Sequence, residues 1–246
     1  MTAFRSKINP NAESFAKNRA DMLALVDKLR ELNARGAQIS AKRAARFAAR
    51  GQLLPRERLA RLLDPGMPFL TVGNLAGYLL DTDDPQRSIP GSTVITGIGF
   101  IGGVRCMIVV DDSGIAAGTL TSATGYRVTR CEEIALQQKL PFVHLVESAG
   151  GDLLNYTVEG FSAGGALFGN LARLSKAGIP VISILHGSST AGGAYVPGMS
   201  DYVVMVNENA RVYLAGPPLV KMATNEDADE EELGGAAMHS RVSGVS

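Results

Sequence analysis

The sequence has few cysteines and no long apolar run, and each absence excludes a class of protein. The two cysteines, Cys106 and Cys131, lie in apolar stretches, and their spacing fits neither a zinc site nor a disulfide framework. No apolar run approaches the ~18 residues of a membrane-spanning helix, and the first residues lack the apolar segment of a secretion signal. We therefore expect a reduced, cytoplasmic protein that does not contact a membrane.

Several binding motifs are missing as well. There is no Walker A motif and no G-x-G-x-x-G between a strand and a helix, which argues against NTP and dinucleotide binding. The three histidines, His144, His186 and His239, are not spaced like metal ligands, and HExxH is absent. We predict no directly bound metal. Nucleic-acid binding is not expected either, because no aromatic residues are interleaved with the basic ones.

The chain begins with a basic segment. Residues 1–64 carry 14 Lys/Arg against 6 Asp/Glu, which leaves 10 against 18 for the rest of the chain. Apolar residues at helical spacing predict a helix over residues 13–34, and a second basic helical stretch follows at 40–50. Pro55 then opens a short helix. We expect residues 1–64 to form a basic helical arm, which either contacts phosphate or an acidic partner or is simply a solvated surface.

After residue 90 the pattern changes to strands that alternate with helices. Gly102 and Gly103, between two β-rich segments, predict a hairpin. Later apolar runs are unbroken, which is typical of strands buried on both faces. The expected strands are residues 94–100, 104–110, 142–146, 181–185, 202–206 and 211–215, with helices near 123–138 and 158–177. This alternation predicts an α/β domain over residues 65–246.

Three successive strands of this domain end in loops of small residues. The first loop contains Ser113 and Gly114, and the second contains Ala149, Gly150 and Gly151. Such loops would lie along one edge of the sheet, beyond the carboxyl ends of the strands, where ligands bind in these folds. Together they predict a binding site built largely from backbone.

The third loop runs into a helix that is expected to begin near Gly192. Because the first amides of a helix lack intrahelical partners and carry partial positive charge, the amides of Gly192, Gly193 and Ala194 are candidates for an oxyanion hole. Tight packing of the helix against the strand would explain the same small residues.

One motif indicates a different chemistry. Residues 160–164 match the G-x-S-x-G nucleophile elbow around Ser162, and Asp201 and His239 follow in hydrolase order. The elbow requires a strong strand directly before the serine, and residues 152–159 are too polar for one. A serine at the start of a helix is the better interpretation.

Four ordered segments resemble the carboxyltransferase subunits of biotin-dependent acyl-CoA carboxylases. They are GQLLPRERL with LLDPG (residues 51–66), TAGGAYVP with MSD (190–201), YLAGPPLVK (213–221) and LGGA (233–236). The residues of the second and third segments most resemble the methylcrotonyl-CoA and geranyl-CoA branch of the family. The resemblance covers roughly residues 45–246.

This resemblance implies a crotonase-like (ClpP-like) fold that binds acyl-CoA. It implies biotin as the cofactor, carried by a partner biotin carboxylase/biotin carboxyl carrier subunit, and a homo-oligomer for the full-length subunit. The amides at Gly192 would polarise the thioester carbonyl and stabilise its enolate, while Gly216 would contact the substrate. Arg56, Arg58 and Arg127 are the candidates for binding CoA phosphates.

The resemblance also leaves alternatives. Asp152 stands where the family usually has Arg or Asn, which bears on the acyl group that is bound. The biotin-side domain of the family is absent, so we expect this chain alone to bind weakly and to catalyse little. A CoA-ester hydratase or isomerase, a biotin-dependent decarboxylase subunit and a non-catalytic CoA-binding scaffold remain the other interpretations.

Overall fold

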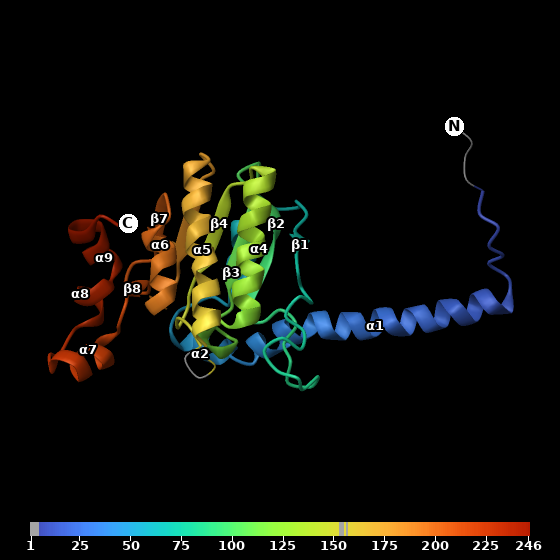
Figure 1. Cartoon of the computed structure of the whole chain (residues 1–246), viewed down its shortest axis with the longest axis horizontal. Helices are drawn as coiled ribbons and strands as arrows, with labels where there is room; N and C mark the ends of the chain where they lie inside the picture. The colour runs from blue at the N-terminus through green and yellow to red at the C-terminus, as the bar shows by residue number, and fades with distance from the viewer. Residues whose placement is uncertain (1–4, 153–154, 156) are drawn as a thin grey trace.

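The computed structural model, which describes residues 5–152, 155 and 157–246, is built around a six-stranded sheet with a projecting helical arm (Figure 1). The strand order is β1-β2-β3-β4-β5-β7, in which β1, β2 and β3 are antiparallel and β3, β4, β5 and β7 are parallel. The strands are β1 (Leu70–Thr71), β2 (Val94–Ile101), β3 (Val104–Asp111), β4 (Phe142–Val146), β5 (Val181–Leu185) and β7 (Tyr202–Met205). The expected α/β class is confirmed.

The predicted hairpin joins β2 to β3. Gly102 and Gly103 both have positive φ, at 58° and 78°, a conformation that glycine adopts without the usual steric cost. Asp64 closes the turn, because its two carboxylate oxygens accept hydrogen bonds from both glycine amides at 2.7 Å. This contact ties the end of the arm to the sheet.

Helices cover both faces of the sheet. On one face α4 (Ser122–Gln138) and α5 (Val158–Lys176) lie side by side and bury residues such as Val128 and Leu171 against β3, β4 and β5. On the other face α3 (Pro55–Leu62) places Leu59 against Ile108. The central strands are therefore buried on both sides, as their unbroken apolar runs predict.

One expected strand is not buried in this way. Tyr202 and Val204 of β7, the edge strand of the described sheet, are 64% and 55% exposed, whereas Val203 and Met205 on its other face pack against the core. A small second sheet pairs β6 (Ser188–Thr190) with β8 (Arg211–Tyr213). The last elements are α7 (Pro217–Thr224), α8 (Glu230–Gly234), α9 (Ala236–Met238) and a π-helical turn η4 (His239–Ser243).

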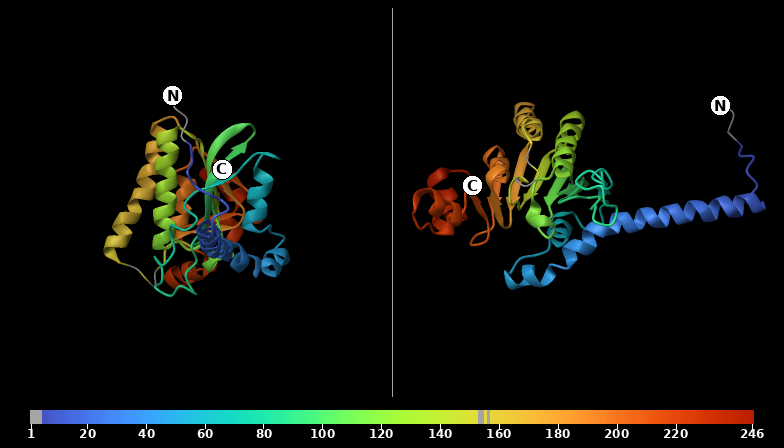
Figure 2. Two further views of the ribbon diagram at one scale, coloured as in Figure 1. Left: turned by 90° about the vertical axis from the view of Figure 1, so that its right-hand side faces the viewer. Right: turned by 60° about the horizontal axis from the view of Figure 1, so that its bottom comes forward.

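The arm consists of α1 (Glu13–Ala41), α2 (Ala44–Ala49) and α3. Helix α1 is longer than predicted, since Gly36 does not interrupt it. Most of it projects from the body, and only its C-terminal end is buried, around Gly36 and Ser40 (Figure 2). There Ser40 donates a hydrogen bond of 2.6 Å to Asp112, directly after β3. Within the described residues, no helix combines the length and apolar character needed to cross a bilayer.

Candidate active site

The three small-residue loops meet at the carboxyl ends of β3, β4 and β5, as predicted. The amide of Ala149 donates to the carbonyl of Ala117 at 3.1 Å, which joins the second loop to the first. The amide of Ser148 donates to Ser188 at 3.2 Å, and the amide of Thr190 returns a bond to Ser148 at 2.9 Å. These backbone bonds hold the loops in one rigid unit.

The second loop gives the site its shape, because two of its amide donors are already used in hydrogen bonds within the loops. The amides of Ala149 and Gly150 already bond to Ala117 and to the Ser148 hydroxyl. Gly150 has φ +90°, and a Cβ there would lie 3.0 Å from Ala191 of the third loop. Of the three predicted residues of this loop, Ala149 lines the cleft, while Gly150 lets the second and third loops pass closely. Gly151 follows in the same loop, outside the residues that line the cleft.

The third loop enters a short helix, as expected. Residues Ala191–Ala194 form a 3₁₀ turn, η3, that continues into α6 (Tyr195–Gly198). The two glycines differ in their surroundings. A Cβ on Gly193 would lie 2.9 Å from Ser148 Cβ and Ser189 Oγ, whereas one on Gly192 would meet Leu120 at 3.8 Å and nothing nearer. Packing thus accounts for glycine at 193, and it leaves open space beside the backbone at 192.

A cleft of about 680 Å³ lies beside these loops. Ser113, Gly114 and Ala149 line its floor, so the structure gathers residues predicted from two separate loops. The wall on the arm side carries Arg43, Arg46 and Arg50, from α2 and its two flanking positions. All three are exposed, and within the described chain none of them forms an ion pair. The cleft therefore combines an uncompensated positive wall with a floor of backbone and small side chains.

The arginine candidates chosen from the sequence lie elsewhere. Arg58 is buried, forms an ion pair with Glu147 and donates to the carbonyl of Leu53 at 2.8 Å. Its guanidinium also lies 5.7 Å from the ring centre of Phe47 on α2. Internal groups take up Nε and Nη1, whereas Nη2 is buried without a partner among the described residues. Arg58 therefore connects the arm to the β4 loop rather than meeting solvent.

The guanidinium of Arg127 is likewise hydrogen-bonded to internal groups. It is 4% exposed and donates to the carbonyl of Val94 and the hydroxyl of Thr96, each at 2.7 Å, and to the carbonyl of Gly91. Burial lowers the pKa of Arg127 to about 10, so it remains a cation at neutral pH. Arg56 is exposed on α3, outside the residues that line the cleft. The arginines that line the cleft, at positions 43, 46 and 50, share a helical face, which is a pattern that the sequence alone shows.

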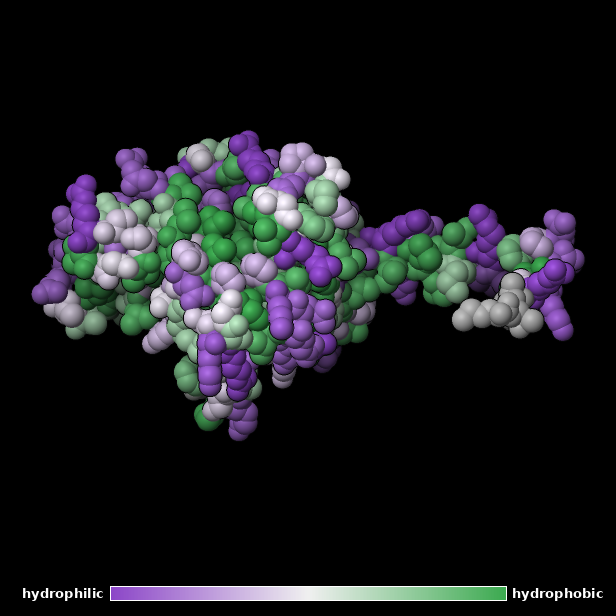
Figure 3. Space-filling model, turned by 90° about the horizontal axis from the view of Figure 1, so that it is seen from above, coloured by the Kyte–Doolittle hydropathy of each residue, from purple (hydrophilic) through white to green (hydrophobic). Residues whose placement is uncertain are grey.

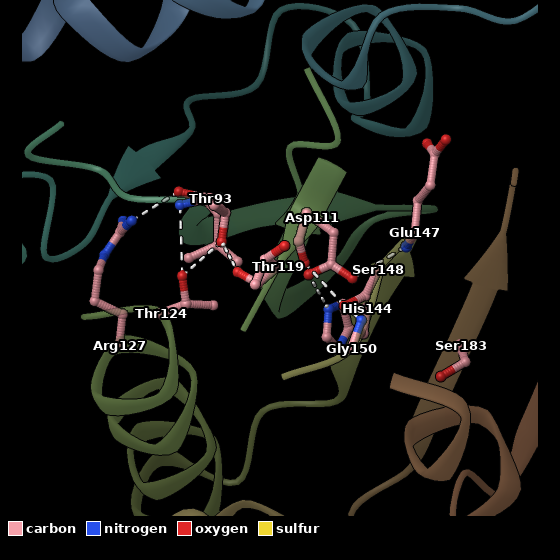
Figure 4. A network of polar contacts seen from close by, with 12 residues as sticks. Thr93, Asp111, Thr119, Thr124, Arg127, His144, Glu147, Ser148, Gly150 and Ser183 are labelled. Atoms are coloured by element: carbon pink, nitrogen blue, oxygen red, sulfur yellow. Dashed lines mark hydrogen bonds and ion pairs between the residues drawn. The ribbon is translucent and has the colours of Figure 1, made fainter. Parts of the chain in front are cut away.

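A buried polar cluster supports the β4 loop (Figure 4). Asp111 bonds His144 at 3.0 Å and accepts the amide of Glu147 at 3.0 Å. The Glu147 carboxylate, held by Arg58, lines the cleft. Burial, followed by the charge of Arg58, lowers the pKa of the neighbouring His186 to about 4, so its ring is neutral at pH 7. His144 is therefore a buried, hydrogen-bonded residue, whereas Nδ1 of His186 has no partner among the residues that the structure describes.

The hydrolase alternative does not fit the geometry. Ser162 lies inside α5, whose N-cap is Thr157, rather than on a strand-to-helix elbow. His239 bonds the carbonyl of Val212 at 2.9 Å, and Asp201 accepts from Ser175 at 2.6 Å. The three residues are thus held by separate partners. Gly216 caps α7 beside the Tyr213 ring and does not line the cleft, so its predicted substrate contact is not placed there.

Comparison with known proteins identifies the family. Residues 46–246 match the model of the carboxyl transferase domain. The chain is 47% identical to a probable biotin-dependent acyl-coenzyme A carboxylase beta2 subunit of Mycobacterium tuberculosis, over 98% of this chain and 44% of that protein. It is also 47% identical to the beta subunit of Pseudomonas aeruginosa geranyl-CoA carboxylase, with a TM-score of 0.90 over 100% of this chain and 45% of the other.

A more distant structure, the hexameric transcarboxylase 12S with methylmalonyl-coenzyme A bound, is 29% identical with a TM-score of 0.78, over 91% of this chain and 43% of that one. These matches confirm the crotonase-like fold and the similarity to the geranyl-CoA branch. The chain spans less than half the length of the relatives it matches. On the match over most of its residues, the chain belongs to the carboxyl transferase domain family of biotin-dependent acyl-CoA carboxylases.

Proposed function

We propose that this chain is the acyl-CoA-binding part of a carboxyltransferase component, which stabilises a thioester enolate while carboxyl is transferred from carboxybiotin. The observation that carries the proposal is the cleft, which runs from the arginines of α2 to the loops at Ala149 and Thr190. Gly192, Gly193 and Ala194 do not line it, but Thr190 is the residue that caps their turn. A CoA ester has its negative charge at one end and its reactive carbonyl at the other. The cleft has groups suited to each.

The arginine wall would bind the phosphates of CoA. Guanidinium groups match phosphate geometry and form charge-assisted hydrogen bonds. Arg43, Arg46 and Arg50 are exposed and without ion pairs, whereas Arg211 on the opposite wall is neutralised by Glu230 and Glu231 at 3.0 and 2.7 Å. Phosphate contact is therefore assigned to the α2 side of the cleft, in place of Arg58 and Arg127.

The thioester carbonyl would then lie against the turn at Gly192, Gly193 and Ala194. Amides at the start of a helix stabilise negative charge on a carbonyl oxygen, so loss of a proton from the acyl chain becomes easier. Carboxybiotin, presented by a partner biotin carboxyl carrier, would supply the carboxyl group as CO2, and the freed ureido oxygen of biotin would accept the proton of the acyl chain. Among the described cleft residues, Glu147 is held by Arg58 and does not enter this scheme as a base.

This arrangement favours the carboxyltransferase over the alternatives. A hydratase or isomerase would use free carboxylates beside the oxyanion hole. Of the carboxylates that line the cleft, Glu147 is paired with Arg58 and Glu230 with Arg211, and Glu208 lies without an ion pair among the described residues. A decarboxylase subunit or a CoA-binding scaffold would use the same cleft, and activity with an added biotin-side partner distinguishes them.

By analogy with its relatives we also propose that the longer subunit is a homo-oligomer. The buried free thiols of Cys106 and Cys131 fit a cytoplasmic location.

Calorimetric titration of the chain with a panel of acyl-CoA esters tests the proposal. We expect Arg46→Ala to weaken binding about tenfold through loss of one charge-assisted contact, while Arg61→Ala, an exposed arginine on α3 outside the cleft, leaves affinity unchanged. If the two variants behave alike, the arginine wall is not the phosphate site.

The carbonyl position needs a separate variant. Gly192→Val should abolish the preference for acyl-CoA over free CoA without loss of stability, because the space around a side chain there is open. The corresponding change at Gly193 would disturb packing and could not separate the two effects. Unchanged acyl preference in a folded Gly192→Val protein would contradict the assignment of the thioester to this turn.

A further inference from the structure

The arginine wall of the cleft belongs to the arm, whereas the floor belongs to the loops that follow the strands. Figure 3 shows the long helix of the arm extending from the body. The buried residues of this helix are Gly36 and Ser40, near its C-terminal end. The wall begins directly after that end, because the amide of Arg43 donates to the carbonyl of Ser40 at 2.9 Å. Contacts made by Ser40 therefore bear on where the wall arginines lie.

Asp112, directly after β3, joins this end of α1 to the cleft floor. Its Oδ1 accepts a hydrogen bond from the Ser40 hydroxyl at 2.6 Å and another from the amide of Gly114 at 3.2 Å. Ser40 and Asp112 are both buried, and Gly114 lines the cleft. Hydrogen bonds to an ionised acceptor are strong, and more so where water is excluded. One carboxylate oxygen thus holds the last turn of α1 and the floor together.

The junction around Asp112 is closely packed. A Cβ on Gly114 would overlap the Ser40 hydroxyl and lie 3.0 Å from Ser40 Cα, so glycine lets the helix approach the floor. Burial raises the pKa of Asp112, whereas the Ser40 hydroxyl, the charge of Arg56 on α3 and the Gly114 amide oppose the rise, and the charge of Glu147 adds to it. The groups that face Asp112 therefore come from two helices of the arm and from the loops after β3 and β4.

We propose that Asp112 is a positioning residue for CoA binding, which sets the spacing between the arginine wall and the cleft floor by holding Ser40 and Gly114 on one oxygen. The inference rests on the proposed function, in which the wall binds the phosphates. Arg58 supplies a second attachment of the wall, through its contact with Phe47 of α2. Since a guanidinium binds phosphate with a fixed geometry, a wall that shifts against the floor binds CoA more weakly.

A double-mutant cycle tests this role, with calorimetric titration of the full chain by free CoA, which carries the phosphates. We expect Ser40→Ala to weaken binding about fivefold, because the wall loses its attachment to Asp112. In the Arg46→Ala background the same change should cost about twofold or less, since the contact acts through the wall arginines. Ser183→Ala, which removes a buried hydroxyl bonded to Ser200 at 2.7 Å outside the cleft lining, is the matched control and should leave affinity unchanged.

Two further measurements follow the junction itself. Ser40→Ala should raise hydrogen exchange of the α2 amides about threefold or more without a ligand, while the amides of β4 stay protected. Gly114→Ala keeps both hydrogen-bonding groups but pushes the helix away from the floor, so it should also weaken CoA binding.

The outcomes separate this inference from the proposed function. Unchanged affinity in Ser40→Ala, equal losses from Ser40→Ala in the wild type and in Arg46→Ala, or unchanged exchange in α2 would each overturn the positioning role and leave the phosphate site in place. An Arg46→Ala protein that binds CoA as tightly as the wild type would overturn the proposed phosphate site, and the positioning role with it.

Discussion

The sheet that carries the candidate site and the arm that projects from it use similar apolar side chains in different ways. Leu171 on α5 is fully buried against the sheet, whereas Leu25 on α1 is 63% exposed. The loops beside the sheet are joined by backbone hydrogen bonds, while α1 is held only near its end, by contacts such as Ser40 with Asp112. Apolar surface thus stabilises the fold in the first region, and in the second much of it is exposed.

The largest expected effect concerns the residue that joins the two regions. Arg58→Ala removes the partner of Glu147 and the contact with Phe47. We expect the free energy of unfolding to fall by about 3–5 kcal/mol, because a buried carboxylate is left uncompensated. Urea titration measures the change. Arg61→Ala on the same helix should alter it by less than about 0.5 kcal/mol, and equal effects would contradict a connecting role for Arg58.

A pair of matched truncations sharpens the comparison. Leu171→Ala should cost about 3 kcal/mol, because it opens a cavity between α5 and the sheet. Leu25→Ala should cost less than about 1 kcal/mol, since little of that side chain is buried. Thermal unfolding of both variants provides the test. A large loss from Leu25→Ala would mean that the arm belongs to the core.

A smaller effect depends on pH and on Glu132, which is buried between α4 and α5. Burial raises the pKa of Glu132 from 4.5 to about 9; nearby Asn170 opposes the shift, although neither carboxyl oxygen makes a hydrogen bond of standard geometry. Between these values the folded protein binds one more proton than the unfolded chain, so stability falls as pH rises. Glu132→Gln should remove this dependence and raise the free energy of unfolding at pH 8 by about 2 kcal/mol.

Denaturation curves at pH 5 and pH 8 check this prediction. The variant and the wild type should be similar at pH 5 and diverge toward pH 8. Parallel pH profiles for the two proteins would show that Glu132 is not held in its protonated form.

Regular elements with strong local patterns were predictable. The hairpin at Gly102 and Gly103 and the strands β4 and β5 follow from turn chemistry and unbroken apolar runs. The exposure of β7 was not predictable, because a central and an edge strand share one local pattern and differ only in their neighbours. For the same reason β8 was detected as a strand but not assigned to a separate sheet.

The backbone loops of the candidate site were predictable from the sequence, and its charged side chains were less so. Small residues after three strands indicated the loops that meet beside the cleft. The structure holds Arg58 and Arg127 among buried internal partners, and the sequence could not show this, since a guanidinium that binds a ligand and one that bonds a buried carbonyl look alike in sequence. Their roles depend on partners such as Glu147 and Val94, which are distant along the chain.

The sequence by itself determined the α/β class, the glycine-bearing loops and the family, because these depend on periodicity, on residues with special backbone freedom and on ordered motifs. Only the tertiary structure decided which charges are paired and which apolar faces are covered. It buried Arg58 and left Arg46 exposed in the cleft, and it covered Leu171 but not Leu25. Burial and pairing are properties of neighbours in space, and those neighbours are brought together only when the chain folds.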